Sequence, residues 1–178
     1  MEKTYYQYLT VEQLLAYTYA DYETITAEQI AGLSKDQMFA IHINWLRPSA
    51  LAGLTADNIT GIKDYRYFNE WNSPSQMALI SPAAFAGLEV NQLLAISYEN
   101  YSGITAEQIK TLSKDKMYAI HINWLTPSAL AGLTADNITG ITNDRYFSEW
   151  ISPEQMALIH PAAIAALTDQ KYLAIKLA

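Results

Sequence analysis

The chain has 178 residues, of which 51% are hydrophobic and 16% are charged, a composition typical of a folded protein. Its net charge of −7, without a clustered basic patch, argues against nucleic acid or an anionic membrane surface as a partner. The absence of cysteine excludes disulfides, thiol catalysis and thiolate metal sites.

No apolar run approaches the roughly 18–20 residues that a membrane span needs, so no membrane segment is predicted. The first ten residues, MEKTYYQYLT, lack the basic and apolar regions of a secretory signal. The sequence therefore leaves the compartment unknown, with the cytoplasm as the default and a signal-independent secretion route as the alternative.

A nine-residue signature recurs along the chain, most clearly in residues 33–41 (LSKDQMFAI). It has the form apolar, Ser or Thr, two variable residues, Gln, apolar, two variable residues, Ile. Copies occur at 9–17, 33–41, 54–62, 72–80, 88–96, 112–120, 133–141, 151–159 and 167–175. Repeats of about 20 residues indicate a solenoid, because one unit cannot bury its apolar face alone.

The copies themselves repeat over a longer distance. Their closing residues are separated by 24, 21, 18 and 16 residues, and the same four steps then recur, so a unit of 79 residues is duplicated. Residues 48–62 (PSALAGLTADNITGI) reappear letter for letter as residues 127–141. We predict one solenoid domain over 1–178, with a duplication of 9–87 as 88–166 and a partial final rung at 167–178.

In chain order, residues 1–8 are expected to form an N-terminal cap. The arms between signatures, such as 26–32, 48–53 and 82–87, begin with Thr or Pro and end in Gly, which predicts short helices. The arm at 64–71 and its copy at 143–150 are richer in aromatic residues and also predict a short helix.

The end of the signature reads Met38-x-x-Ile41-x-Ile43 and, later, Leu93-x-x-Ile96-x-Tyr98. This spacing resembles the leucine-rich-repeat family, which implies an α/β solenoid of short parallel strands and short helices with the strands lining one face. A Gln or Asn column precedes each expected strand and is predicted to hydrogen-bond from rung to rung. Its members are Gln13, Gln37, Asn58, Gln76, Gln92, Asn137 and Gln155.

The alternative is an all-α solenoid of short helices. Thr10-x-x-Gln13 and Ser34-x-x-Gln37 are capping boxes, and valine, a strand former, occurs only twice. Residues 152–159 (SPEQMALI) also resemble the first helix of a transcription-activator-like effector repeat. Two helices within a 16-residue step would have about six residues each, too short to pack well, so the α/β solenoid is the preferred prediction.

His42, His121 and His160 each follow the closing Ile of a signature. On a strand they would point outward in a polar column that includes Lys63, and they would lie too far apart to share a metal ion. No motif for a nucleophile, a phosphate loop or a metal site occurs. We therefore predict a non-catalytic protein without a metal or cofactor.

The 13 tyrosines and four tryptophans are in excess of what a thin core needs. Tyr and Trp supply rigid contact area, so the sequence predicts a scaffold that binds a protein partner through its strand face and its exposed aromatic residues. The candidate residues are His42, Lys63, His121, His160, Tyr19, Tyr98, Trp45, Trp124, Tyr67 and Tyr146.

The last residues suggest a second function. The repeat is interrupted at Ala178 without a polar capping unit, and an uncovered rung is a template for another chain. The alternative hypothesis is a structural module that assembles end to end as a homo-oligomer. The candidate contact residues are Tyr172, Leu173, Ile175 and Leu177.

Overall fold

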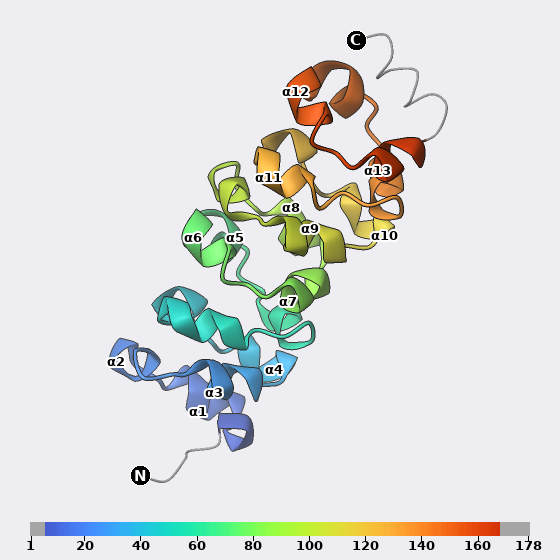
Figure 1. Cartoon of the computed structure of the whole chain (residues 1–178). Coiled ribbons are helices and arrows are strands. Elements are labelled where there is room, and N and C mark those ends of the chain that lie inside the picture. The colour runs from blue at the N-terminus through green and yellow to red at the C-terminus, as the bar shows by residue number, and fades with distance from the viewer. Residues whose placement is uncertain (1–5, 168–178) are drawn as a thin grey trace.

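A computed structural model describes residues 6–167 as an elongated stack of short helical turns, with α1 near one end and α13 near the other (Figure 1). Every regular element in this range is a helix of three to six residues, and the range contains no strand. The predicted α/β, leucine-rich-repeat-like solenoid is therefore wrong. The all-α alternative fits the structure.

The first half contains a series of α- and 3-10 helices: η1 (Tyr6–Tyr8), α1 (Val11–Leu15), α2 (Tyr19–Tyr22), α3 (Ala27–Ala31), α4 (Lys35–Met38), η2 (Ile43–Trp45), η3 (Pro48–Gly53), η4 (Asn58–Gly61), α5 (Arg66–Asn69), α6 (Pro74–Met77) and α7 (Pro82–Gly87). The second half contains α8 (Val90–Leu94), η5 (Glu99–Gly103), α9 (Ala106–Thr111), α10 (Lys114–Met117), η6 (Ile122–Trp124), α11 (Pro127–Leu130), η7 (Asn137–Gly140), η8 (Tyr146–Trp150, a π-helical turn), α12 (Pro153–Met156) and α13 (Pro161–Ala165).

The helices follow a period of eight residues, shorter than the signature spacing. An apolar or aromatic residue that packs into the core recurs every eight residues, at Leu9, Tyr17, Ile25, Leu33 and Ile41. We call the stretch from one of these residues to the next a segment. The residue after each of these core residues is the N-terminal cap of the next helix. The arms therefore repeat the same unit as the signatures. Two segments depart from this length in each half, 41–46 and 62–72, with their copies 120–125 and 141–151.

Each segment packs against the segment three positions further along the chain. The pairs include α3 with η3, α4 with η4, α6 with η5, and α7 with α9. One coil of the solenoid therefore contains three segments. The coils approach so closely that a Cβ atom at Gly61 would overlap the carbonyl oxygen of Lys35, and one at Gly140 would overlap that of Lys114.

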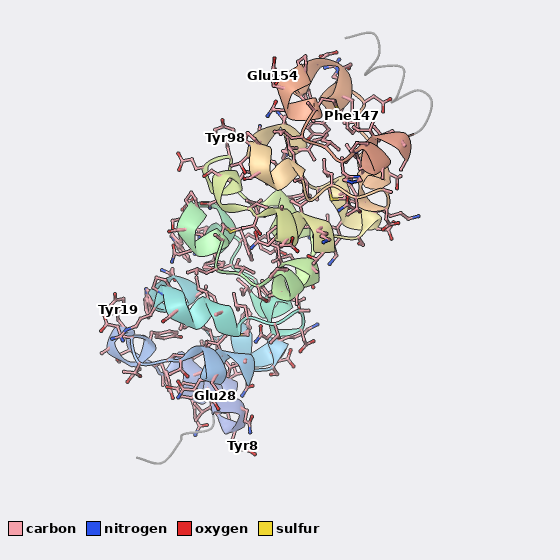
Figure 2. All side chains as sticks on the ribbon, viewed as in Figure 1. Tyr8, Tyr19, Glu28, Tyr98, Phe147 and Glu154 are labelled. Carbon is pink, nitrogen blue, oxygen red and sulfur yellow. The ribbon has the colours of Figure 1, made fainter. Side chains whose placement is uncertain are left out.

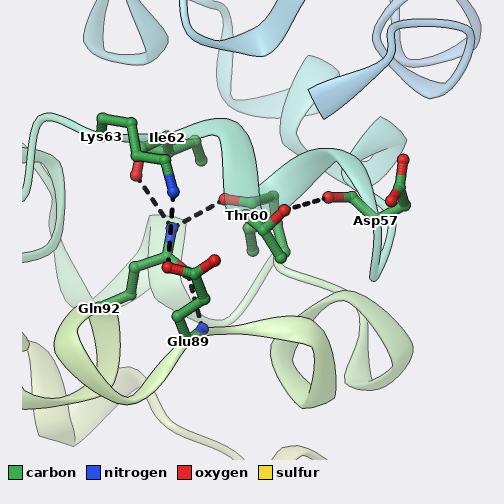
Figure 3. A network of polar contacts seen from close by, with 7 residues as sticks. Asp57, Thr60, Ile62, Lys63, Glu89 and Gln92 are labelled. Carbon is green, nitrogen blue, oxygen red and sulfur yellow. Dashed lines mark hydrogen bonds and ion pairs between the residues drawn. The ribbon is translucent and has the colours of Figure 1, made fainter. Parts of the chain in front are cut away.

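The Gln and Asn column explains how such short helices are stable. In Figure 3, the Gln92 side-chain oxygen accepts the backbone N–H of Glu89 at 2.8 Å, which caps α8. The amide nitrogen of Gln92 donates to the carbonyl oxygens of Ile59 (2.8 Å) and Ile62 (3.0 Å) in the preceding coil. The sequence prediction placed these bonds from rung to rung, and the acceptors are backbone carbonyls.

Other members of the column make the same bond across one coil. Gln37 donates to Leu9 at 2.7 Å, Asn58 to Ile30 at 2.9 Å and Asn137 to Ile109 at 3.0 Å. Gln108, which the prediction did not include, donates to Ile80 at 2.7 Å. The predicted members Gln13, Gln76 and Gln155 make only local bonds within their own helical turns. Each amide that bonds across a coil satisfies a helix terminus and an otherwise orphaned carbonyl at once. The argument that helices of about six residues are too short failed because capping and these ties replace helix length.

Residues 6–167 contain no strand, so the predicted strand-face column is absent from this part of the chain. Its histidines occupy the corners between helices, where His42, His121 and His160 are N-terminal caps. His160 shows the role directly, since its Nδ1 accepts the backbone N–H of Ala162 at 3.1 Å.

The self-association candidates Tyr172, Leu173, Ile175 and Leu177 lie outside the described residues. Among residues 6–167, no helix has the length and apolar character needed to cross a membrane.

Candidate functional site: two aromatic corners

The unequal segments create a distinctive corner in each half. Segment 41–46 contains only the three-residue turn η2, and the longer segment 62–72 lies three positions further along the chain. In the second half the corresponding turns η6 and η8 are in contact. Aromatic side chains gather where the short segment leaves space, so these corners are the candidate site.

The first aromatic corner consists of Tyr19, Tyr22, His42 and Trp45. The buried Tyr22 hydroxyl donates to the carbonyl oxygen of Ala40 (3.1 Å) and accepts the backbone N–H of His42 (3.1 Å). His42 stacks on Trp45 with ring centroids 4.3 Å apart, and Tyr19 packs edge-on against the same indole at 6.0 Å. Burial raises the pKa of Tyr22, so its hydroxyl stays protonated.

The second aromatic corner consists of the equivalent residues Tyr98, Tyr101, His121 and Trp124. The buried Tyr101 hydroxyl accepts the His121 backbone N–H at 3.0 Å. His121 stacks on Trp124 at 4.0 Å, and Tyr98 meets the edge of that indole at 5.4 Å. The duplication therefore builds the same ring arrangement twice.

The exposed parts of the corners are the outer tyrosines. Tyr19 is 57% exposed and Tyr98 is 66% exposed, and both project outward on the left of the molecule in Figure 2. Trp45 and Trp124 are half-buried beneath them. The two corners are one duplicated unit apart, which is ten segments, and one coil contains three segments. Ten segments are three full coils and one further segment, so the second corner lies on the side of the stack next to that of the first.

Tyr67 and Tyr146, two further candidates, are only 2% and 6% exposed and therefore do not offer an exposed ring face. Their surroundings differ. The Tyr146 hydroxyl is 3.0 Å from Nδ1 of His121, and its ring meets Trp150 edge-on at 5.0 Å. The Tyr67 hydroxyl is buried without a hydrogen-bond partner among the described residues. Burial raises the pKa of both phenols and lowers the pKa of His121.

A cavity of about 480 Å³ adjoins the first aromatic corner. Its lining is mainly apolar and includes the polar residues His42, Asn44, Lys63 and Asp64. The lining residues are Leu15, Met38, Phe39, Ala40, Ile41, His42, Ile43, Asn44, Ile62, Lys63, Asp64, Tyr67 and Trp71. His42 therefore faces both the stacked indole and the cavity, and connects the two features.

The two remaining candidates, Lys63 and His160, lie outside the two aromatic corners. Lys63 lines the cavity and forms an exposed ion pair with Glu89 at 3.4 Å. His160 caps α13 and has no ring contact with either corner. Sequence reasoning missed Tyr22 and Tyr101, although their equal position in both copies, three residues after the outer tyrosines, marked them.

Comparison of the chain with protein-family models, with curated proteins and with solved structures gave no match.

Proposed function

We propose that the protein is a non-catalytic repeat scaffold that binds a protein partner through its two aromatic corners. One observation carries this proposal: Tyr19 and Tyr98 expose more than half of their surface at equivalent places, each against a half-buried tryptophan. Exposed tyrosine above tryptophan is the composition of interface hot spots, which combine apolar area with a polar tip.

The corners are also held rigidly, which favours binding. In the first corner, the Tyr22 hydroxyl fixes the backbone of His42, and His42 supports the indole of Trp45. Side chains that are already ordered lose less entropy when a partner covers them. We infer binding and not catalysis because the same residues recur at both corners, whereas a catalytic constellation is needed only once.

The test is selection of peptide binders on the wild-type chain, followed by calorimetry with the selected peptides. We expect two equivalent sites per chain. Tyr19→Ala or Tyr98→Ala should weaken binding at its own corner at least about ten-fold and reduce the stoichiometry from two to one. The matched control is Leu79→Ala, because Leu79 is 43% exposed and belongs to neither corner.

Binding that survives in the Tyr19→Ala, Tyr98→Ala double variant would contradict the proposal. Light scattering over a dilution series separates the alternative, end-to-end assembly. In that case the mass would grow with concentration above the 19.9 kDa of one chain.

A further inference from the structure

Trp150 continues the second aromatic corner into the next coil. Tyr146 links the two, because its hydroxyl is 3.0 Å from Nδ1 of His121 and its ring meets Trp150 edge-on at 5.0 Å. The turns η6 and η8, which carry Trp124 and Trp150, are in contact. Trp150 is 41% exposed, so the aromatic surface of this corner extends from Tyr98 to a second exposed ring.

The first half shows which group an indole at this position binds. At the equivalent Trp71, the guanidinium of Arg66 lies over the ring, with its Cζ atom 4.1 Å from the centroid. Asp64 accepts hydrogen bonds from this guanidinium, from Nη2 to Oδ2 at 2.6 Å and from Nε to Oδ1 at 3.0 Å. Indole is the best ring for a cation–π contact, and a carboxylate matches the fork of arginine. The first half therefore contains an arginine site that its own side chain fills.

The second half has the indole without the guanidinium. Arg145 is the equivalent of Arg66, but within residues 6–167 its contact is with Glu149 at 3.8 Å, and no guanidinium lies over Trp150. The side chains of Arg145 and Glu149 are both more than half exposed. Because an exposed ion pair of this length contributes little to stability, it competes weakly with a second cation for the carboxylate.

The segment around Trp150 is also more acidic than its counterpart in the first half. Residues 63–75 carry two basic and two acidic side chains, a net charge of 0. Their copies, residues 142–154, carry one basic and three acidic side chains, a net charge of −2. Asp144 and Glu154 are the added acidic residues; both are exposed, and Glu154 projects from α12 in Figure 2. Exposed carboxylates attract a cation to this ring and disfavour an anion.

We propose that Trp150 and Glu149 bind an arginine side chain of the protein partner, as Trp71 and Asp64 bind Arg66. The inference rests on the proposed function and specifies the partner as a basic segment that crosses the second corner. The planar guanidinium stacks on the indole while its N–H groups donate to the carboxylate, an arrangement that the ammonium of lysine cannot reproduce. A peptide with arginine therefore binds the second corner more tightly than the first, whereas a peptide without arginine binds both equally.

The experiment is a titration of the full, 15N-labelled chain with three tripeptide amides, tri-arginine, tri-lysine and tri-citrulline. Citrulline has the shape of arginine without its charge. The readout is the indole N–H signal of Trp150, and that of Trp71 is the internal reference. We expect tri-arginine to shift the Trp150 signal and leave the Trp71 signal unchanged. Tri-lysine should bind about two- to five-fold more weakly, and tri-citrulline should cause no shift.

A matched pair of variants tests the carboxylate. Glu149→Gln should weaken the binding of tri-arginine at Trp150 about two- to five-fold, because one opposite charge is lost. The control is Glu70→Gln, the same change at the equivalent position of the first half, which should leave the Trp150 titration unchanged.

A second pair tests whether the first half is filled by its own arginine. Arg66→Gln removes the guanidinium over Trp71, so the Trp71 signal should now respond to tri-arginine. In the control Arg145→Gln, the Trp71 signal should remain unresponsive, because Arg66 still covers that ring.

Five results would each overturn the inference. They are a Trp150 signal that does not move, equal shifts at Trp71 and Trp150 in the wild-type chain, equal affinity for tri-arginine and either of the other tripeptides, unchanged affinity in Glu149→Gln, and an unresponsive Trp71 in Arg66→Gln.

Failure of this inference is distinguishable from failure of the proposed function, because the tripeptides need no partner. If Trp150 does not respond, while selected peptides still depend on Tyr19 and Tyr98, the arginine site is removed and the scaffold stays. If Trp150 responds to tri-arginine but no peptide depends on either tyrosine, binding through the aromatic corners is removed and a site for a guanidinium stays.

Discussion

The two halves of the molecule repeat one 79-residue unit and yet complete their corners differently. Tyr146 is satisfied by His121 and Trp150 from its own chain, whereas Tyr67 is buried with an unpaired hydroxyl beside a cavity. The core residues of the two corners are the same. The difference shows that two copies with the same corner residues can leave the same tyrosine paired or unpaired. It coincides with a different partner for the arginine of the segment, Asp64 for Arg66 and Glu149 for Arg145.

The largest expected effect concerns what the halves share, the close approach of their coils. Gly61→Ala and Gly140→Ala would each place a Cβ atom against the backbone carbonyl of the preceding coil. We expect each to lower the free energy of unfolding by about 1–3 kcal/mol in urea denaturation.

Gly32→Ala is the matched control for these two variants. A Cβ atom at Gly32 would come no nearer than 3.4 Å to the side chain of Gln7, so this substitution should be close to neutral. Equal effects at Gly32 and Gly61 would refute coil contact as the reason for glycine.

The next largest effect is a change in the free energy of unfolding when tyrosine is replaced by phenylalanine, and it should have opposite signs in the two halves. Tyr67→Phe removes an unpaired buried hydroxyl and should raise the free energy of unfolding by about 1 kcal/mol. Tyr146→Phe removes the hydrogen bond to His121 and should lower it by about 1 kcal/mol. Paired urea denaturation curves measure both, and effects of the same sign would show that the two corners are alike.

A smaller effect is expected where the halves diverge in charge. Asp64→Asn gives the first half the residue of the second, so Arg66 should release Trp71. The indole N–H signal of Trp71 should then shift toward that of Trp150 in a 15N spectrum. The variant Lys63→Thr is the control, because it also introduces the second-half residue but leaves the Asp64–Arg66 pair intact. An unchanged Trp71 signal in Asp64→Asn would show that the Asp64 carboxylate does not determine the position of Trp71.

The sequence predicts part of this arrangement and not the rest. The duplication, the helical arms and the aromatic excess follow from spacing and composition. The strand prediction failed because Met38-x-x-Ile41-x-Ile43 suits a strand as well as a capped turn followed by a corner. The amide of Gln92 serves two backbone partners in different coils, and only the folded coil shows that this replaces helix length. The sequence could not predict that the Tyr67 hydroxyl is unpaired, because Tyr67 and Tyr146 are the same residue type at the same position of the repeat.

The smallest effect is a dependence on pH that belongs to the second half. Burial lowers the pKa of His121 in the folded protein, whereas in the unfolded chain it is about 6.5. Between these two values the unfolded chain binds more protons, so the free energy of unfolding rises with pH. The stabilisation by neutral His121 is complete above pH of about 6.5 and is lost as the pH falls toward the folded pKa.

Urea denaturation at pH 7.5 and 5.5 measures this loss. His121→Gln cannot titrate and should lose less stability between the two values than the wild-type chain. Tyr146→Phe keeps the imidazole in its half-buried position and should retain the wild-type dependence. If His121→Gln instead keeps the full dependence on pH, another group titrates in this range. The pH dependence of the stability would then not arise from His121 in the second aromatic corner.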